Sequence, residues 1–331
     1  MKKHKNLRER LFMFLGMSMS TLLILVTMLA LPTIIPAISQ NIEKNTESIS
    51  ETDNLVTKLT ETETNINSES ENIMPESENI ASKKLSYVEQ CELPYVAPPE
   101  KRDAEEALET IKELSPYYPG MYIVYQNADQ YPDEVLKSLA SNPEMLDYCI
   151  DFLNSDGSVT GGITEDEKPE DHPLFLQWDK RWGYMPYGSV STVAASGCGP
   201  SCLSMVVYYL TGDTSATVDD AASYSLEQGY YVEGVGTAWA LLDTYPTLYG
   251  LKVKHPSLSE ENLKNHLDKG NYLICSMRPG DFTSEGHFLV IYDYDENGFK
   301  INDPKCVYRS RLSWSYEQIK DDIKRVWSIG K

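Results

Sequence analysis

The segment Ser196-Gly-Cys-Gly-Pro-Ser-Cys-Leu-Ser-Met205 decides how the second half of the chain folds. A strongly apolar stretch runs from Pro200 to Leu210, and Gly212 follows at a position where glycine typically ends a helix. Proline is favoured at the first position of a helix, so Pro200 marks its start. We therefore predict a helix over 200–210, with Cys198 between two glycines directly before it.

Cys198 has the surroundings that activate a thiol. Its small neighbours leave the sulfur accessible, and the positive end of the helix dipole lowers a thiol pKa and favours the thiolate. A thiolate that attacks a carbonyl also needs a base and proton donor. The alternative is that Cys198 is simply a small buried hydrophobic residue.

Of the five histidines, His287 is the best candidate for that base. It opens the apolar strand predicted over 287–294, and such a rigid mount suits a general base. The other four lie in the N-terminal tail, in an acidic linker, before a proline and on an amphipathic helix: His4, His172, His255 and His266. The alternative for His287 is a hydrogen-bonded core histidine.

The carboxylates close to His287 in the sequence are Asp281, Asp293, Asp295 and Asp303. The strands 287–294 and 299–303 should form a hairpin around the turn at 295–298. If residues 294 and 298 pair, 289 lies opposite 303, and Asp303 becomes a diagonal neighbour of His287 at ~7–8 Å. A slip of one residue would turn Asp303 to the other face, and Asp281 stays an alternative in the preceding loop.

The elements around these residues indicate an α+β fold. A short apolar strand is predicted at 174–176, and the helical patterns cover 217–228, 237–249 and 259–270. The strands that follow are predicted at 272–277, 287–294, 299–302 and 325–329. Helices followed by clustered antiparallel strands are typical of α+β domains.

Several short motifs in this half occur in a family order: Gln177-Trp-Asp-Lys-Arg-Trp-Gly183, Tyr187-Gly188, Gly197-Cys-Gly-Pro200, Gly280-Asp-Phe-Thr283, Gly286-His-Phe288 and Asn302-Asp-Pro304. Residues 173–331 thereby resemble the bacterial papain-like cysteine peptidases related to the leader-peptide-cleaving domain of bacteriocin exporters. The resemblance implies a papain-like fold, in which the helix with the nucleophile packs on an antiparallel sheet. It implies Cys198 as nucleophile, His287 as base and acid, Asp303 as the residue that orients His287, and Gln177 as the oxyanion-hole glutamine.

The expected activity is hydrolysis of a peptide or other amide bond through a Cys-His-Asp triad. Processing of a bacteriocin leader is a weaker expectation, because the exporters join their peptidase to membrane spans and an ATPase. Cleavage of cell-wall peptide cross-bridges is an alternative, and so is a catalytically inactive surface binding module that kept the fold. No metal or organic cofactor is expected. Cys198 and Cys202 have poor zinc spacing without a nearby histidine, which argues against a metal role for Cys202.

The N-terminal part predicts export. Residues 1–39 contain a basic cluster and then an uncharged apolar run at 11–38, long enough for the about 20 residues that span a bilayer. The basic cluster should stay cytoplasmic, which leaves the rest of the chain extracytoplasmic and anchored to the membrane. The alternative is a signal peptide cleaved near Ser39, which would release the protein.

Two further regions separate this segment from residues 173–331. Residues 40–84 are rich in Glu, Ser, Thr and Asn and have no aromatic residue, which predicts a disordered tether; an acidic interaction arm is the alternative. Residues 85–172 predict a mostly helical accessory region with a packing or spacing role. Its predicted elements are a helix from Asp103, a strand at 121–125, helices from Pro132 and Pro143, and a linker at 155–171.

Composition limits the partners. Acidic residues outnumber basic ones 50 to 29, a net charge of −21, which argues against a nucleic-acid binder. The expected partners are a peptide or protein substrate and the membrane, through residues 11–38. Among the six cysteines, Cys202 and Cys275 are expected to be buried thiols, a Cys91–Cys149 disulfide stays open, and Cys306 is either paired or free.

Overall fold

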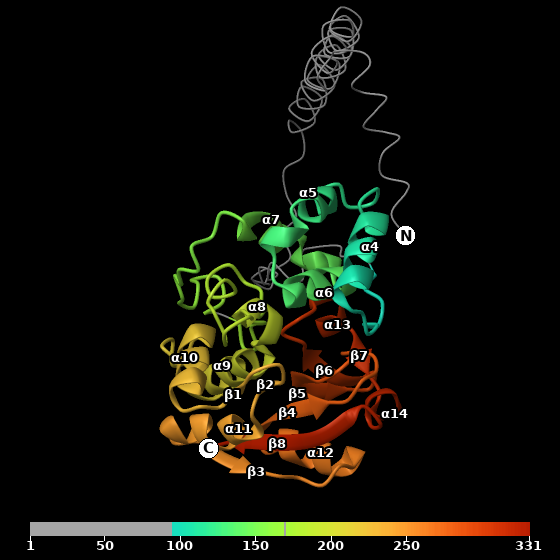
Figure 1. Ribbon diagram of the computed structural model, residues 1–331. Helices are drawn as coiled ribbons and strands as arrows, with labels where there is room; N and C mark the ends of the chain where they lie inside the picture. The colour runs from blue at the N-terminus through green and yellow to red at the C-terminus, as the bar shows by residue number, and fades with distance from the viewer. Residues whose placement is uncertain (1–94, 169) are drawn as a thin grey trace, which may run out of the picture. The chain divides into compact units, whose positions relative to one another are not determined.

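The computed structural model describes residues 95–168 and 170–331 (Figure 1). All of these described residues belong to one compact unit, 82–331. The expected anchor at 11–38 and the expected tether at 40–84 therefore lie outside the described residues, as does Cys91. None of the helices in the described ranges has the length and apolarity needed to cross a membrane.

The accessory region is helical, as predicted. Its elements are α4 (Ala104–Leu114), α5 (Met121–Gln126), η1 (Ala128–Gln130), α6 (Asp133–Ser141), η2 (Pro143–Met145) and α7 (Leu146–Phe152). A capping box starts α4, because the side chains of Asp103 and Glu106 each accept the other residue's backbone N–H. Buried residues of these helices, among them Ile111, Leu139 and Met145, form a core of their own.

Two short strands predicted from sequence are wrong. Residues 121–125 belong to helix α5, since Met121 and Val124 lie three residues apart and both point into the accessory core. Their burial on one helical face outweighs the β propensity of the local sequence. Residues 174–176 form no regular strand, and the buried ring of Phe175 simply packs into the main core.

The second half begins with helices around a buried centre. They are α8 (Val193–Ser196), α9 (Cys198–Thr211), α10 (Val218–Glu227), α11 (Trp239–Leu248) and α12 (Glu260–Leu267), with the short α13 (Val307–Ser310) and α14 (Tyr316–Ile319) later in the chain. Helix α9 begins at Cys198, two residues before the predicted start, and ends at Gly212 with φ 69°. Cys198 is thus the first residue of the helix rather than a residue before it.

An antiparallel sheet follows these helices. In the described part of the chain its strand order is β3-β8-β4-β5-β6-β7. The bounds are β3 (Lys252–Lys254), β4 (Tyr272–Met277), β5 (His287–Asp295), β6 (Gly298–Asn302), β7 (Ser313–Trp314) and β8 (Ile323–Gly330). A separate two-stranded hairpin joins β1 (Tyr231–Val232) and β2 (Gly236–Thr237). The α+β prediction is confirmed.

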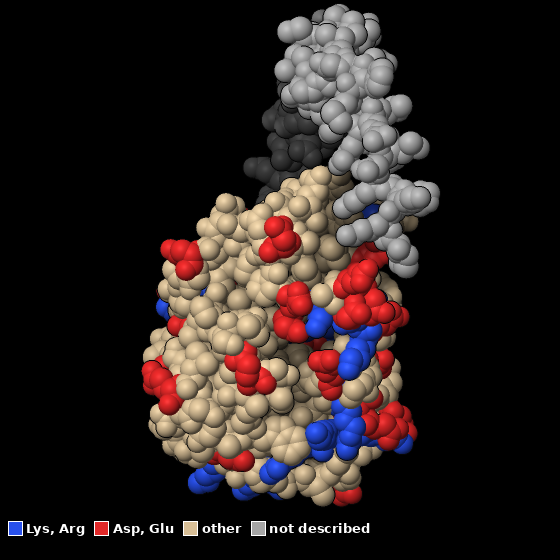
Figure 2. Space-filling view, viewed as in Figure 1, with Lys and Arg blue, Asp and Glu red and all other residues tan. Residues whose placement is uncertain are grey.

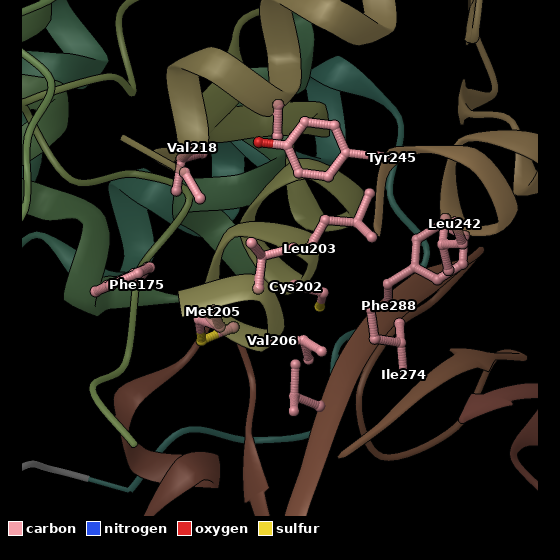
Figure 3. Packing of buried hydrophobic residues seen from close by; sticks show 14 of the residues in the cluster. Phe175, Cys202, Leu203, Met205, Val206, Val218, Leu242, Tyr245, Ile274 and Phe288 are labelled. Atoms are coloured by element: carbon pink, nitrogen blue, oxygen red, sulfur yellow. The ribbon is translucent and has the colours of Figure 1, made fainter. Parts of the chain in front are cut away.

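Helix α9 packs on one face of this sheet. Leu203 and Val206 from the helix share a core with Ile274 of β4 and Phe288 of β5 (Figure 3). The alternate strand residues, such as Leu273, point to a second core that includes residues of α12. Burying each large apolar side chain contributes about 1.5–3 kcal/mol, so this contact fixes α9, and with it Cys198, against the sheet.

The hairpin of β5 and β6 has the predicted register beyond its bulge but not near its turn. Tyr294 pairs with Phe299 instead of residue 298, so the register near the turn is one residue away from the prediction. A β-bulge between Ile291 and Asp293 then restores it, and Val290 pairs with Asn302. Continued beyond Asn302, this register places residue 303 opposite 289, as predicted from the sequence.

Candidate active site

Two glycines allow the N-terminus of α9 to lie close to its neighbours. A Cβ atom at Gly197 would lie 2.5 Å from the carbonyl oxygen of Val193, and one at Gly199 would lie 2.8 Å from Cγ2 of Thr237. Real Cβ atoms do not approach other atoms so closely, so a larger residue at either position would push the helix away. The glycines on both sides of Cys198 therefore have a packing reason as well as leaving the sulfur accessible.

His287 links Cys198 to Asp303. It is the first residue of β5, it is buried, and its Nε2 lies 2.7 Å from Oδ1 of Asp303. The imidazole also forms a hydrogen bond with the Cys198 sulfur. Because Nε2 is occupied by the carboxylate, Nδ1 is the nitrogen left for the sulfur.

The Asp303 carboxylate is fully buried and receives three hydrogen bonds. Oδ1 accepts from His287 Nε2 and from the backbone N–H of Lys305 at 2.8 Å, and Oδ2 accepts from Arg309 Nε at 2.8 Å. Burial alone would raise its pKa, but the charges of His287 and Arg309 and their hydrogen bonds hold the pKa well below the ordinary value. Asp303 is therefore ionised at neutral pH.

These surroundings lower the pKa of the Cys198 thiol and raise the pKa of the His287 imidazole. Burial would raise the pKa of the Cys198 thiol, but the hydrogen bond and charge of His287, with the backbone N–H of Phe288, lower it. Burial would lower the pKa of His287, yet the charge and hydrogen bond of Asp303 raise it to about 9. The arrangement favours a thiolate beside an imidazolium, the charge state of an activated cysteine.

Gln177 joins the two sides of the site. Its backbone N–H donates to the carbonyl oxygen of Pro304 at 2.8 Å, and its side-chain Nε2 donates to the carbonyl oxygen of Ala194 in α8. Turning the amide over would set two carbonyl oxygens against each other, so the nitrogen must face Ala194. One N–H of the Gln177 amide is thus used by Ala194.

Of the carboxylates considered from the sequence, Asp303 is the one in contact with His287. Asp293 is exposed, Asp295 pairs with Lys300 at 2.6 Å, and the backbone of Asp281 is bound to Asp322. The structure thus brings Cys198, His287 and Asp303 into one hydrogen-bonded series. The catalytic roles assigned to them and to Gln177 stay predictions.

Sequence reasoning missed Arg309 and Lys305. Arg309 is buried against Asp303, and its charge helps to lower the carboxylate pKa. The charge of Lys305 acts in the same direction on the Cys198 thiol. Neither residue lies on a strand, so the alternation of apolar residues could not predict the direction of its side chain. The turn after Asp303-Pro304 was the only sequence signal nearby.

The aromatic residues that soon follow Gln177 and the described cysteines other than Cys198 are buried or form hydrogen bonds to the backbone. Trp182 and Tyr187 are fully buried and pack in the core, while Trp178 donates from Nε1 to the Lys305 carbonyl oxygen at 2.8 Å. Burial raises the pKa of the Cys202 thiol well above its ordinary value, as expected for an inert thiol. The remaining described cysteines are buried free thiols: Cys149, Cys275 and Cys306. Within residues 95–168 and 170–331, no cluster of three His, Cys, Asp or Glu side chains could hold a metal ion.

Comparison with known proteins places the second half of the chain. Residues 170–330 match the model of the Peptidase_C39 like family. The peptidase domain of Streptococcus ComA, a bifunctional ABC transporter involved in quorum sensing, is 18% identical over 48% of this chain and 96% of that chain, with a TM-score of 0.33. A Bacillus anthracis protein described as a C39-like peptidase is 15% identical over 48% of this chain and 94% of its own, with a TM-score of 0.30. The chain has no match among curated proteins.

Proposed function

We propose that the chain is a cysteine peptidase that hydrolyses a peptide or other amide bond with Cys198 as nucleophile, because residues 170–330 match the model of the Peptidase_C39 like family. The observation that carries the proposal is the buried series in which Cys198 bonds to His287 and His287 bonds to Asp303. The thiol pKa is lowered and the imidazole pKa raised, which is what nucleophilic catalysis by cysteine requires.

The reaction would proceed through a thioester. The Cys198 thiolate attacks the carbonyl carbon, and the His287 imidazolium gives its proton to the leaving amine. Water, deprotonated by the now neutral His287, then hydrolyses the thioester and releases the acid. The second amide N–H of Gln177 and the backbone N–H of Cys198, which has no acceptor within α9, would hold the oxyanion. Losing one such donor costs about 10²–10³ in rate.

An inactive binding module is less well supported. Such a module would need no buried charges, and buried ion pairs seldom stabilise a fold more than apolar residues of similar size. Yet Asp303 and Arg309 are 0% and 2% exposed; Asp303 contacts His287, and Arg309 contacts Asp303. Retention of this costly group is explained by a catalytic role for His287.

We also propose that the enzyme acts outside the cytoplasm, anchored through residues 11–38 and extended by residues 40–84. The support is the basic cluster followed by an uncharged apolar run in the sequence. A peptide is favoured over nucleic acid as the partner by the charge of −21. On the face drawn in Figure 2, Lys and Arg lie in small groups beside Asp and Glu rather than in a continuous basic surface.

Labelling with a thiol-reactive probe built on a peptide amide tests the proposal. We expect the wild-type protein to carry the probe on Cys198, located by digestion and mass spectrometry, and Cys198→Ala to remain unlabelled. Since Cys202 is fully buried with a raised pKa, Cys202→Ala should label like the wild type. A Cys198 that reacts only as fast as an ordinary thiol would leave the inactive binding module as the better account.

A further inference from the structure

The carboxylate in contact with His287 lies at the start of a short segment, residues 303–310, which we call the aspartate strap; it consists of a turn followed by helix α13. Its internal hydrogen bonds converge on Asp303, which accepts from the Lys305 N–H and from Arg309 Nε. The N–H of Asp303 itself donates to the hydroxyl of Ser310 at 2.8 Å. The position of the carboxylate therefore depends on the conformation of the whole strap.

The accessory region holds this strap from outside. The Glu144 carboxylate accepts the backbone N–H of Val307 at 2.7 Å and that of Tyr308 at 2.8 Å, which are the first two residues of α13. The side chain of Asn142 donates to the carbonyl oxygen of Lys305 at 2.6 Å. These partners are 163 or 164 residues apart in sequence.

The two accessory side chains are themselves fixed. Asn142 is fully buried, and its Oδ1 accepts the N–H of Glu144 at 3.1 Å. Hydrogen bonds from N–H groups to an ionised carboxylate are roughly twice as strong as those to a neutral acceptor. A helix of four residues such as α13 leaves its first N–H groups without partners of its own, so Glu144 satisfies donors that the strap cannot satisfy internally.

The accessory core also reaches the other side of the site. Ala194 of α8 is buried among the accessory residues, and its carbonyl oxygen receives the Gln177 side chain. Tyr148 of α7 donates to the carbonyl oxygen of Gly183 at 3.1 Å. The accessory helices thus contact the supports of both Asp303 and Gln177, which exceeds what a spacer requires.

Resting on the proposed function, we propose that Asn142 and Glu144 are positioning residues for catalysis. They hold the aspartate strap so that the Asp303 carboxylate stays on His287 Nε2 and keeps the imidazole protonated beside the thiolate. Full activity of residues 173–331 then depends on the accessory region. Loosening the strap should weaken the contact between Asp303 and His287 before it unfolds the domain.

Glu144→Gln in the full chain tests this role. Glutamine keeps the size of the side chain, but its NH₂ group opposes one of the two backbone donors. The matched control is Glu109→Gln on α4, an exposed glutamate whose partner is Lys112. The readout is the rate of Cys198 alkylation by a small uncharged reagent as a function of pH, with circular dichroism to show that each variant is folded.

In the wild type we expect alkylation to begin at a lower pH than for an ordinary thiol, because the hydrogen bond and charge of His287 stabilise the Cys198 thiolate. In Glu144→Gln this acidic limb should move up by about one pH unit, because a weaker Asp303 contact makes the His287 imidazolium less able to stabilise the thiolate, while Glu109→Gln keeps the wild-type profile. In an Asp303→Asn background, Glu144→Gln should cause no further shift, because it acts through Asp303.

An unchanged limb in folded Glu144→Gln, or an equal further shift in the Asp303→Asn background, would overturn the positioning role. If Glu144→Gln does not fold, Asn142→Ala, which loses the hydrogen bond to Lys305, replaces it. The same shift of the pH profile is then measured in the wild-type and Asp303→Asn proteins. A wild-type Cys198 with the pH profile of an ordinary thiol would instead contradict the proposed function. The two failures are therefore distinguishable.

Discussion

Replacing Asp303 by asparagine removes the charge that controls His287. The carboxylate lies 2.7 Å from His287 Nε2, and its charge is the main cause that raises the imidazole pKa from 6.5 to about 9. Asparagine has nearly the same shape, so it keeps the space filled and one acceptor oxygen. We expect the pKa of His287 to fall toward its ordinary value.

The size of the effect follows from the two pKa values. At pH 8 an imidazole with a pKa of about 9 is about 90% protonated, whereas one with a pKa of about 6.5 is about 3% protonated. The fraction of active thiolate–imidazolium pair should therefore fall about 30-fold at this pH. Any misorientation of the ring adds to that loss.

The same substitution should lower stability. A raised His287 pKa stabilises the folded state fully below pH 6.5, and this contribution is lost as the pH rises through about 9. Asp303→Asn removes it across that window. It also leaves the buried Arg309 without its charged partner, and breaking a buried pair in this way costs up to about 3–5 kcal/mol.

The assay is substrate turnover between about pH 5 and pH 10, at a temperature where circular dichroism shows both proteins folded. Asp293→Asn is the control, because it makes the same chemical change at an exposed position of β5 and should behave like the wild type. Unchanged turnover at pH 8 in Asp303→Asn, together with a loss of turnover in Asp281→Asn, would refute the assignment.

Further outcomes follow from the same geometry. Cys198→Ala should abolish turnover with the fold retained in circular dichroism, while Cys202→Ala should keep turnover at lower stability; label on Cys202 alone would reverse the two roles. Gly199→Ala places a Cβ 2.8 Å from Thr237, so calorimetry should show about 1–3 kcal/mol of lost stability, together with reduced turnover; wild-type values for both would contradict this close packing. Protease added to intact cells should cut within 40–84 and release the folded part; protection of the chain would contradict the proposed export.

The sequence predicts which residues form the candidate site better than it predicts the strand register and loop contacts that bring them together. Cys198 could be found because a glycine-flanked cysteine before an apolar helix is a local pattern. His287 could be found because it opens a strand. Both signals lie within a few residues of the group concerned, which is the range over which periodicity and turn residues act.

The register of the β5–β6 hairpin depends on a bulge that local sequence patterns do not predict. The prediction that 289 lies opposite 303 holds only because the bulge at Tyr292 compensates for a turn that starts one residue away from the expected position. The Tyr292 ring stacks on His172 at a centroid distance of 4.8 Å, a contact between distant segments. No local pattern in β5 signals that contact, so the bulge could not be foreseen.

The strap and its supports could not be predicted for the same reason. Glu144 looks like an ordinary acidic residue at the start of a helix, and Arg309 like a surface charge. The role of Glu144 comes from its contact with a segment distant in the chain, and that of Arg309 from the turn and short helix α13 that place it against Asp303. The misread strand at 121–125 has a related cause, since burial against the accessory core decided its conformation.

The most direct test of peptidase activity is cleavage of a peptide library by the wild-type protein and by Cys198→Ala, with products identified by mass spectrometry. If Cys198 is the nucleophile, the wild type produces new peptide termini and Cys198→Ala produces none at equal concentration of folded protein. Equal cleavage by both proteins would contradict a role for Cys198 as the nucleophile. An absence of cleavage by a wild-type protein whose Cys198 also reacts no faster than an ordinary thiol would contradict the proposed peptidase activity itself.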